Sequence, residues 1–111
     1  MKDENCIFCK IISKEIPAEV LFENERLVIL QDIKPSAPLH HLIIPKKHIR
    51  SIMDLEESDS EIISEMIFTA KKNAETAELK GYKLSFNVGR EGGQIIDHLH
   101  LHLMGGWKNQ I

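Results

Sequence analysis

The segment His98-Leu99-His100-Leu101-His102-Leu103-Met104 alternates histidine with leucine without a break through Leu103. On a helix, residues two apart point about 200° away from each other, so the three imidazoles would scatter. On a β-strand they share one face at intervals of about 7 Å, and the three leucines share the other face. The segment therefore predicts a strand over His98–Met104 with an apolar core face and a row of imidazoles opposite to it.

Three imidazoles at this spacing cannot all be protonated comfortably, because like charges lower one another's pKa. Near neutral pH at least one ring is then unprotonated and available as a nucleophile, a base or a metal ligand. A solvated strand face without a chemical role gives no reason for histidine at three successive positions. A zinc site built from these rings alone is disfavoured, because parallel side chains about 7 Å apart converge poorly on one ion.

The residues that precede this strand are rich in glycine. Gly89-Arg90-Glu91-Gly92-Gly93 predicts a tight turn or a mobile loop, whose backbone N–H groups could face an anion. The loop and the histidines together suggest a phosphate held between backbone amides and a neutral imidazole.

The remaining pattern predicts an α+β fold with an antiparallel sheet. Apolar spacing predicts a short helix over residues 6–14 and one long helix, which a Ser58–Glu61 capping box opens and Gly81 ends. Lys46 and Lys47 are expected to be a solvated surface pair. The other strands are predicted at residues 20–23, 27–32, 40–44 and 83–88.

Length and composition indicate a single domain over residues 1–111. Apolar residues make up 42% and charged residues 28%, and 14 Lys and Arg against 17 Asp and Glu leave a net charge of −3. This balance disfavours a nucleic-acid partner, which would need clustered positive charge. No apolar run approaches the roughly 20 residues of a membrane span, and the polar start does not resemble a secretion signal. We therefore expect a cytoplasmic protein with no membrane or nucleic-acid partner.

Cys6 and Cys9 form a Cys-x-x-Cys pair near the N-terminus. A thioredoxin-like redox pair would need a βαβ context, which the sequence does not predict. Two unpaired structural thiols are a second interpretation. The third is a zinc site, for which two further ligands would complete a common Cys₂His₂ set.

The histidine strand matches the His-φ-His-φ-His-φ-φ signature (φ, apolar) of the histidine triad (HIT) superfamily of nucleotide hydrolases and transferases. The chain resembles this family over residues 6–106, and Leu103-Met104-Gly105-Gly106 and Pro45-Lys46-Lys47-His48 resemble its Hint-like branch, the purine nucleoside phosphoramidases. The resemblance implies a five-stranded antiparallel meander sheet with one long helix and a short N-terminal helix. Further matching positions are Phe8, Ile16-Pro17, Asp32-Ile33, Pro35, Ala37-Pro38, His40, Ile44, Gly81-Tyr82, Asn87 and Gly92-Gly93-Gln94.

The resemblance implies an enzyme that cleaves nucleoside 5′-phosphoramidates, AMP or GMP conjugates of amines, to the nucleoside monophosphate. His100 matches the family's nucleophile, which attacks the α-phosphorus and forms a nucleotidyl-histidine that water then hydrolyses. His102 matches the third triad histidine, which contacts the phosphate and the leaving group. His40 matches a fourth histidine that is hydrogen-bonded near the triad.

The resemblance also implies a substrate-binding set. Asp32 matches the acidic residue that binds the ribose hydroxyls, and Asn87 matches a residue that holds phosphate oxygens. The backbone of Gly92–Ile95, which includes Gly93, Gln94 and Ile95, would hold phosphate oxygens as well. The implied base pocket is apolar and consists of Ile7, Phe8, Ile11, Leu30 and Ile33.

Two positions depart from the Hint-like pattern. Ile95 stands where serine is usual, and the loss of one hydroxyl donor there could lower the rate on the order of 10²–10³. Asp97 stands where an aromatic or apolar residue is common.

The Cys-x-x-Cys pair is similar to that of galactose-1-phosphate uridylyltransferase, in which histidines complete a zinc set. That resemblance implies a structural zinc and no organic cofactor. The family's long helix packs against its twin, which implies a homodimer. The implied zinc ligands are Cys6, Cys9, His48 and His98.

Two alternatives stay open. The main substrate could be a dinucleoside polyphosphate, although that branch typically continues Leu-Pro-Arg where this chain has Leu103-Met104-Gly105-Gly106. The chain could also be a nucleotide-binding regulatory module with weak catalysis, which the intact triad disfavours.

Overall fold

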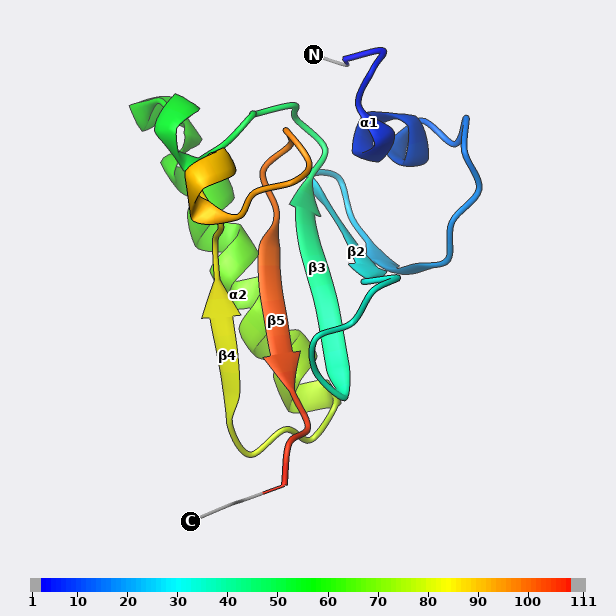
Figure 1. The fold of residues 1–111 in the computed structure, drawn as a ribbon, viewed down its shortest axis with the longest axis vertical. Coiled ribbons are helices and arrows are strands. Elements are labelled where there is room, and N and C mark those ends of the chain that lie inside the picture. Colours follow the sequence, from blue (N-terminus) through cyan, green and yellow to red (C-terminus); the bar gives the residue numbers. More distant parts are fainter. Residues whose placement is uncertain (1–2, 109–111) are drawn as a thin grey trace.

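A computed structural model describes residues 3–108 and contains one five-stranded antiparallel sheet with a long and a short helix (Figure 1). This arrangement confirms the predicted α+β fold. The short helix is α1 (Ile7–Ile12) and the long helix is α2 (Ser60–Thr76). The strands are β1 (Val20–Glu23), β2 (Leu27–Gln31), β3 (Leu39–Pro45), β4 (Tyr82–Ser85) and β5 (Leu101–Gly105).

The strand order departs from a meander at one place. β1, β2 and β3 are sequential neighbours, but β5 lies between β3 and β4, which leaves β4 at the edge. Burial explains this order, because the side chains of Leu101 and Leu103 in β5 are almost completely buried. A central strand places these leucines under the helix, where burial of a leucine side chain contributes about 1.5–3 kcal/mol.

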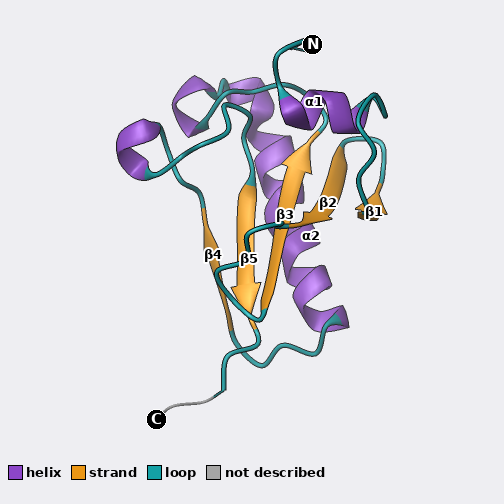
Figure 2. Ribbon diagram, turned by 45° about the vertical axis from the view of Figure 1, so that its right-hand side comes forward, coloured by secondary structure: helices purple, strands orange, loops and turns teal. Residues whose placement is uncertain are grey.

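The sheet has one covered and one partly open face (Figures 1 and 2). α2 covers the first face, where its Met66, Ala70 and Ala74 pack on β2, β3 and β5. The small alanines allow the helix to lie close to the strands. On the second face, α1 covers only one end of the sheet through Phe8 and Cys9. The uncovered part of this face is where a site can form.

The start of the long helix differs from the prediction. The expected Ser58–Glu61 capping box does not form; a short 3₁₀ turn over Glu57–Asp59 precedes α2 instead. The Glu56 N–H donates to the Asp59 carboxylate at 3.0 Å, and the Lys47 ammonium donates to the same carboxylate at 2.6 Å. Lys47 is exposed, as the sequence suggested, but its ammonium pairs with the buried Asp59.

The end of the long helix also differs from the prediction. α2 ends at Thr76, before Gly81, and Glu78 adopts the left-handed conformation with φ of 59°. The Leu79 N–H then donates to the Ala74 carbonyl at 3.0 Å, which closes the helix end. Leu79 packs against the core, and this burial favours an early reversal even without glycine.

The strand that carries the histidines is shorter than predicted. β5 begins at Leu101, so His98 and His100 precede the ladder. β4 likewise ends at Ser85. Within the described range 3–108, no helix has the length and apolar character required to cross a membrane.

Candidate active site and metal centre

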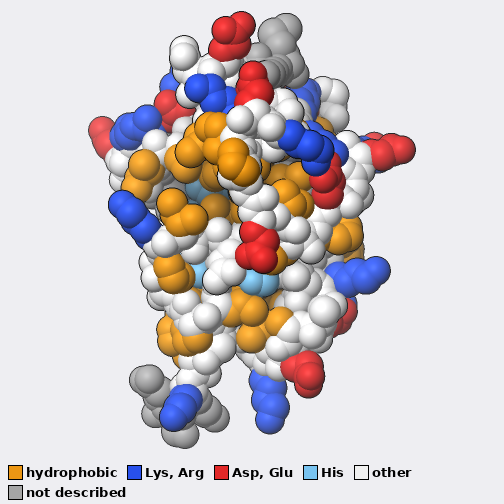
Figure 3. Space-filling view, turned by 90° about the vertical axis from the view of Figure 1, so that its right-hand side faces the viewer, with side chains coloured by type: hydrophobic (Ala, Val, Ile, Leu, Met, Phe, Trp, Pro, Cys, Tyr) orange, Lys and Arg blue, Asp and Glu red, His pale blue; other side chains and the backbone are white. Residues whose placement is uncertain are grey.

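A cavity of about 960 Å³ opens on the partly uncovered face of the sheet. Figure 3 shows histidine side chains in this hollowed face with hydrophobic side chains around them. The predicted catalytic histidines and all predicted substrate-binding residues except Gly92 and Gln94 line it. These lining residues are His40, His100, His102, Asp32, Asn87, Gly93, Ile95, Ile7, Phe8, Ile11, Leu30 and Ile33.

His100 has a defined tautomer. Its Nδ1 lies 2.7 Å from the His98 carbonyl oxygen, which can only accept, so Nδ1 carries the hydrogen. The lone pair is then on Nε2. Burial lowers the pKa of His100 below its ordinary value, so the ring is neutral at pH 7. The edge-to-face contact with Phe8, at 5.3 Å between centroids, holds the ring in place. His100 is therefore suited to act as a nucleophile.

A chain of hydrogen bonds defines the tautomers of His40 and His102. The Ser36 N–H donates to His40 Nδ1 at 3.0 Å, which places the His40 hydrogen on Nε2. That Nε2–H donates to His102 Nδ1 at 2.9 Å. His102 then carries its hydrogen on Nε2, a buried atom with no partner in the described part of the chain. A buried donor without an acceptor is costly, so this geometry is suited to an acceptor atom of a bound molecule.

Charge and burial keep His102 neutral. Burial, with smaller contributions from His100 and His40, lowers the pKa of His102 to about 4. The Asp32 carboxylate lies 3.4 Å from His40 Nε2 and accepts from the Lys34 N–H at 2.8 Å. Asp32, His40 and His102 lie close enough to hold a metal ion. The assigned tautomers already explain the short distance between His40 and His102 as a hydrogen bond, so the geometry of these histidines does not require a metal.

The glycine-rich loop closes on itself. Gly89 and Gly93 have positive φ values of 72° and 87°, which a side chain would strain. The N–H groups of Gly92 and Gln94 donate to the Gly89 carbonyl, and the Gly93 N–H donates to the Arg90 carbonyl. Of the four N–H groups from Gly92 to Ile95, only that of Ile95 has no acceptor among the described residues.

The Gln94 side chain holds the loop and does not line the cavity. Its carbonyl accepts from the Gly89 N–H at 2.9 Å, and its amide donates to the Arg50 and Ile96 carbonyls at 2.7 and 2.9 Å. Ile95 differs, because its side chain is 83% exposed at the cavity. Most donor groups of this loop are therefore already bonded within the protein, and few remain for the phosphate-binding role that the sequence predicted.

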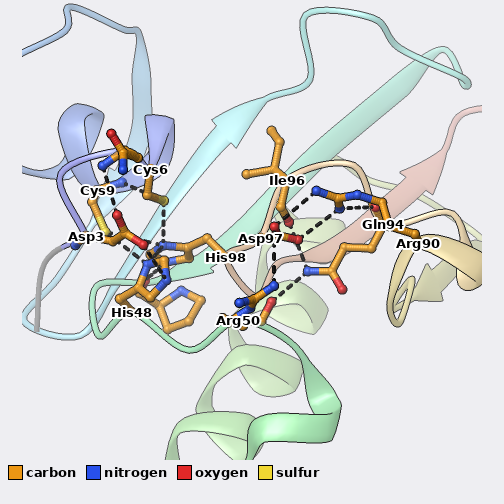
Figure 4. A network of polar contacts seen from close by, with 12 residues as sticks. Asp3, Cys6, Cys9, His48, Arg50, Arg90, Gln94, Ile96, Asp97 and His98 are labelled. Carbon is orange, nitrogen blue, oxygen red and sulfur yellow. Dashed lines mark hydrogen bonds and ion pairs between the residues drawn. The ribbon is translucent and has the colours of Figure 1, made fainter.

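The four predicted metal ligands form one cluster (Figure 4). His98 Nδ1 lies 3.2 Å from Cys6 Sγ, 3.6 Å from Cys9 Sγ and 3.1 Å from His48 Nδ1. Cys9 Sγ lies 3.2 Å from His48 Nδ1. A tetrahedral zinc ion with ordinary bond lengths separates its ligand atoms by about 3.3–3.8 Å. The cluster is therefore close to the size of a zinc tetrahedron.

The surroundings of the cluster also fit a metal. His98 Nε2–H donates to the Pro45 carbonyl at 2.8 Å, which leaves the lone pair on Nδ1, toward the sulfurs. The other ring nitrogen of His48 lies 3.7 Å from the Asp3 carboxylate. Metal-bound histidines commonly have such a carbonyl or carboxylate behind them. Burial lowers the pKa of His98 to about 4 and raises the pKa of the Cys6 thiol, and a cation would stabilise the thiolate. This geometry favours a metal over two unpaired thiols or a redox pair.

The cluster of Cys6, Cys9, His48 and His98 is in direct contact with His100. The Phe8 ring packs edge-on against His98 at 5.7 Å and against His100 at 5.3 Å, and the His98 carbonyl fixes the His100 tautomer. His98 therefore belongs to both sites.

Sequence reasoning missed two polar contacts, one beside the site and one on the covered face of the sheet. The Arg90 guanidinium forms a two-pronged ion pair with Asp97, with nitrogen–oxygen distances of 2.9 and 3.1 Å. The signal that could have revealed this pair is the opposite charge of Arg90, in the glycine-rich loop, and of Asp97, which follows the loop. His41 contacts Asn73 of α2 at 2.7 Å on the covered face, and the pattern of the chain gave no signal for this pair.

Comparison with known proteins gives consistent matches. The family model described as "Scavenger mRNA decapping enzyme C-term binding" matches residues 5–110. Protein HitA of Neisseria gonorrhoeae is 42% identical over 103 residues, which are 92% of this chain and 96% of that protein. A HIT family hydrolase from Legionella pneumophila Philadelphia 1 is 50% identical with a TM-score of 0.91, over 94% of this chain and 95% of the other. A Zn-bound histidine triad family protein from Mycobacterium smegmatis is 28% identical with a TM-score of 0.86, over 96% of this chain and 78% of the other.

Proposed function

The chain belongs to the histidine triad family and is a HIT family hydrolase, and on that premise we propose that it cleaves nucleoside 5′-phosphoramidates. The observation that carries this proposal is the arrangement of His100 and His102. One ring offers a nitrogen lone pair and the other an unpartnered N–H, and both residues line one cavity. A nucleophile beside a hydrogen-bond donor suits attack on a phosphorus atom with a charged oxygen next to it.

The reaction divides into two displacements. His100 Nε2 forms a bond to the α-phosphorus while the P–N bond breaks and a substrate nitrogen that is already protonated leaves as the amine. His102 Nε2–H donates a hydrogen bond to a phosphate oxygen or the leaving group during this step. Water then attacks the phosphorus, the bond to His100 Nε2 breaks, and the nucleoside monophosphate is released with a proton. His100 returns as the neutral imidazole, because its Nδ1 keeps its hydrogen.

The remaining lining residues suit a purine nucleotide. Asp32, which lies at the end of β2, would accept the ribose hydroxyls. Apolar side chains of α1 and β2, among them Ile11 and Leu30, would contact the base. The cavity of about 960 Å³ leaves room for a leaving group beside the nucleotide.

The test is AMP release from adenosine 5′-phosphoramidate by the unmodified chain and by His100→Ala. We expect turnover that the substitution lowers on the order of 10⁴-fold or more, as for other lost nucleophiles. His41→Ala is the matched control, because His41 contacts α2 on the other face of the sheet. Equal activity of the two variants would contradict the proposal. An unmodified chain that binds AMP but releases none from this substrate would point to polyphosphate substrates or to a binding module.

We also propose that Cys6, Cys9, His48 and His98 bind one structural zinc ion per chain. The near-tetrahedral spacing of the four ligand atoms and the Pro45 carbonyl behind His98 support it. When bound, zinc would supply a cross-link between α1 and the segment before β5. Cysteines that are not paired in a disulfide are typical of cytosolic proteins, which supports a cytoplasmic location.

We further propose that the chain is a single domain that forms a homodimer. The outer side of α2 supports the dimer, because Phe68 is 67% exposed there and Ile67 beside it is also exposed. Exposed Tyr82 and Leu84 lie nearby on the sheet edge, in β4. Apolar side chains gathered on one helix and one sheet edge are typical of a surface that a partner covers.

A further inference from the structure

We propose that Asp97 is a positioning residue for the substrate phosphate. It holds Arg90 so that the peptide between Gln94 and Ile95 presents its N–H group to the cavity. The inference rests on the proposed function, because it assumes that a nucleoside monophosphate group binds in this cavity.

We call the Arg90–Asp97 ion pair the clamp, because it holds the Arg90 guanidinium in one orientation. Arg90 Nη1 and Nη2 lie 2.9 and 3.1 Å from the two Asp97 carboxylate oxygens, and Nη1 also donates to the Gln94 carbonyl at 2.7 Å (Figure 4). Two parallel bonds fix the plane of a guanidinium, which a single bond does not. The position of the Gln94 carbonyl oxygen is therefore determined through Arg90 by Asp97.

The peptide plane transmits this restraint to Ile95. In a trans peptide the carbonyl and the following N–H point in opposite directions, and the described chain has no cis peptide bond. The Gln94 carbonyl points to Arg90, and neither Gln94 nor Arg90 lines the cavity, whereas Gly93 and Ile95 do. The Ile95 N–H therefore points away from Arg90, on the cavity side of the loop.

This N–H matters because the loop has no substitute for it. The N–H groups of Gly92, Gly93 and Gln94 donate to carbonyls of the loop itself. Isoleucine at position 95 has no hydroxyl that could serve as a second donor. Among the N–H groups from Gly92 to Ile95, that of Ile95 is thus the one that remains for a phosphate, and Asn87 and Ile96 line the same cavity.

Asp97 could also act simply as a negative charge. The two roles predict opposite changes in the affinity for AMP when Asp97 is neutralised. A carboxylate close to a phosphate site repels the phosphate, so neutralising it would tighten nucleotide binding. Loss of the clamp would instead release the Gln94–Ile95 peptide and weaken phosphate binding. Side chains of Arg90 and Asp97 are 63% and 44% exposed, so the pair contributes little to folding stability. The clamp should therefore affect binding and leave the melting temperature nearly unchanged.

The experiment is calorimetric titration of the full chain with AMP and with adenosine, for the unmodified protein and for Asp97→Asn. We expect the dissociation constant for AMP to rise about 3–10-fold, a partial loss of one hydrogen bond to a charged group, while that for adenosine stays constant. Glu91→Gln is the matched control. It removes a carboxylate from the same loop, and this carboxylate has no hydrogen bond or ion pair with residues 3–108. It should leave AMP binding unchanged or slightly tighter.

A second variant distinguishes loss of the ion pair from a folding defect. Arg90→Gln should weaken AMP binding like Asp97→Asn, and the double variant should be no weaker than either single one, because both act through one clamp. AMP binding to Asp97→Asn that is unchanged or tighter would overturn the inference, and so would an equal loss for AMP and adenosine. Failure of the unmodified chain to bind AMP would overturn the proposed function, and the inference with it.

Discussion

The backbone determines which nitrogen carries the hydrogen in each of three site histidines. A carbonyl oxygen can only accept and an amide can only donate, so the His98 carbonyl, the Pro45 carbonyl and the Ser36 N–H each fix one ring. The three rings thereby obtain different roles, although their side chains are identical. One is suited to be a nucleophile, one to be a metal ligand and one to pass a hydrogen bond to His102.

The acid side of the pH–rate profile follows from these rings. Burial lowers the pKa of His100 from its ordinary 6.5, so the neutral, nucleophilic form persists to lower pH. As pH falls through the lowered pKa, protonation removes the lone pair and activity is lost. We therefore expect the acid limb of kcat/KM for adenosine 5′-phosphoramidate to have its midpoint below pH 6.5.

Asp32 supplies the control for this profile. Its negative charge raises the pKa of His100 and of His102, so Asp32→Asn should move the acid limb to lower pH, whatever its effect on KM. An acid limb centred at pH 6.5 or above in the unmodified protein would contradict the role of burial, and so would a shift of the limb to higher pH in Asp32→Asn.

Single residues show where prediction from the sequence ends. The His–Leu alternation correctly placed His100 and His102 on one face, because the period of a strand is a local property. The contacts of Gln94 and Lys47 could not be predicted, because their partners are supplied by the folded loop or by another element. The spacing of residues in the sequence shows which face of a strand a side chain occupies. It does not show which carbonyl or carboxylate is the side chain's hydrogen-bond partner.

At the scale of elements, the segment His98–His100 is held by contacts outside the sheet. β5 begins at Leu101, so this segment forms no ladder with β3. It is fixed by the hydrogen bond from the Leu99 N–H to the Ile49 carbonyl at 2.7 Å, and by the His98 ring within its cluster with Cys6, Cys9 and His48. A metal ion there would tie α1 and His48 to the residue two before His100.

Removal of the metal should therefore reduce both stability and activity. We expect chelation, or Cys9→Ser, to lower the melting temperature by about 10 °C or more, since 1 kcal/mol corresponds to about 4–8 °C in a domain of roughly 100 residues. We expect kcat to fall as well, because His98 positions His100. Metal analysis should find one zinc per chain in the native protein and less in the variant.

The doubly substituted protein Cys6→Ala/Cys9→Ala is the control for chelation, because a chelator should change neither its melting temperature nor its activity. Native protein that contains no zinc and keeps its melting temperature with a chelator would contradict the metal site.

Element positions followed from the sequence better than element ends. β1 lies where the sequence predicted it, at Val20–Glu23, because β-branched and aromatic residues bounded by a polar turn are a local signal. The predicted ends of α2 were wrong, because the ends depend on the buried Asp59, which pairs with Lys47, and on Leu79, which packs against the core. Tertiary contacts of this kind have no local pattern.

For the whole molecule, both edges of the sheet expose apolar side chains, which are Tyr82 and Leu84 in β4 and Val20, Leu21 and Phe22 in β1. The proposed dimer uses the β4 edge, because α2 carries two further exposed apolar side chains, Ile67 and Phe68. Glu25 lies exposed in the turn that follows β1, at the other edge.

This proposal predicts that Phe68→Lys converts the protein from dimer to monomer at micromolar concentration, because a buried lysine at the centre of the interface is costly. Sedimentation or light scattering measures the mass. Glu25→Lys, which introduces the same side chain at the opposite edge, should remain dimeric. A monomeric unmodified protein, or a dimeric Phe68→Lys variant, would contradict the assignment of this surface.

The late start of β5 has an evolutionary consequence. Substitutions in the buried ladder, at Leu101 or Leu103, would change thermal stability and leave the contacts of His100 with Phe8 and with the His98 carbonyl in place. Substitutions at His48 or Cys6 would change thermal stability and turnover together, because the cluster supports the segment before β5. A lineage could therefore adapt its thermal tolerance through the ladder alone, whereas adaptation to a different metal supply would alter both properties.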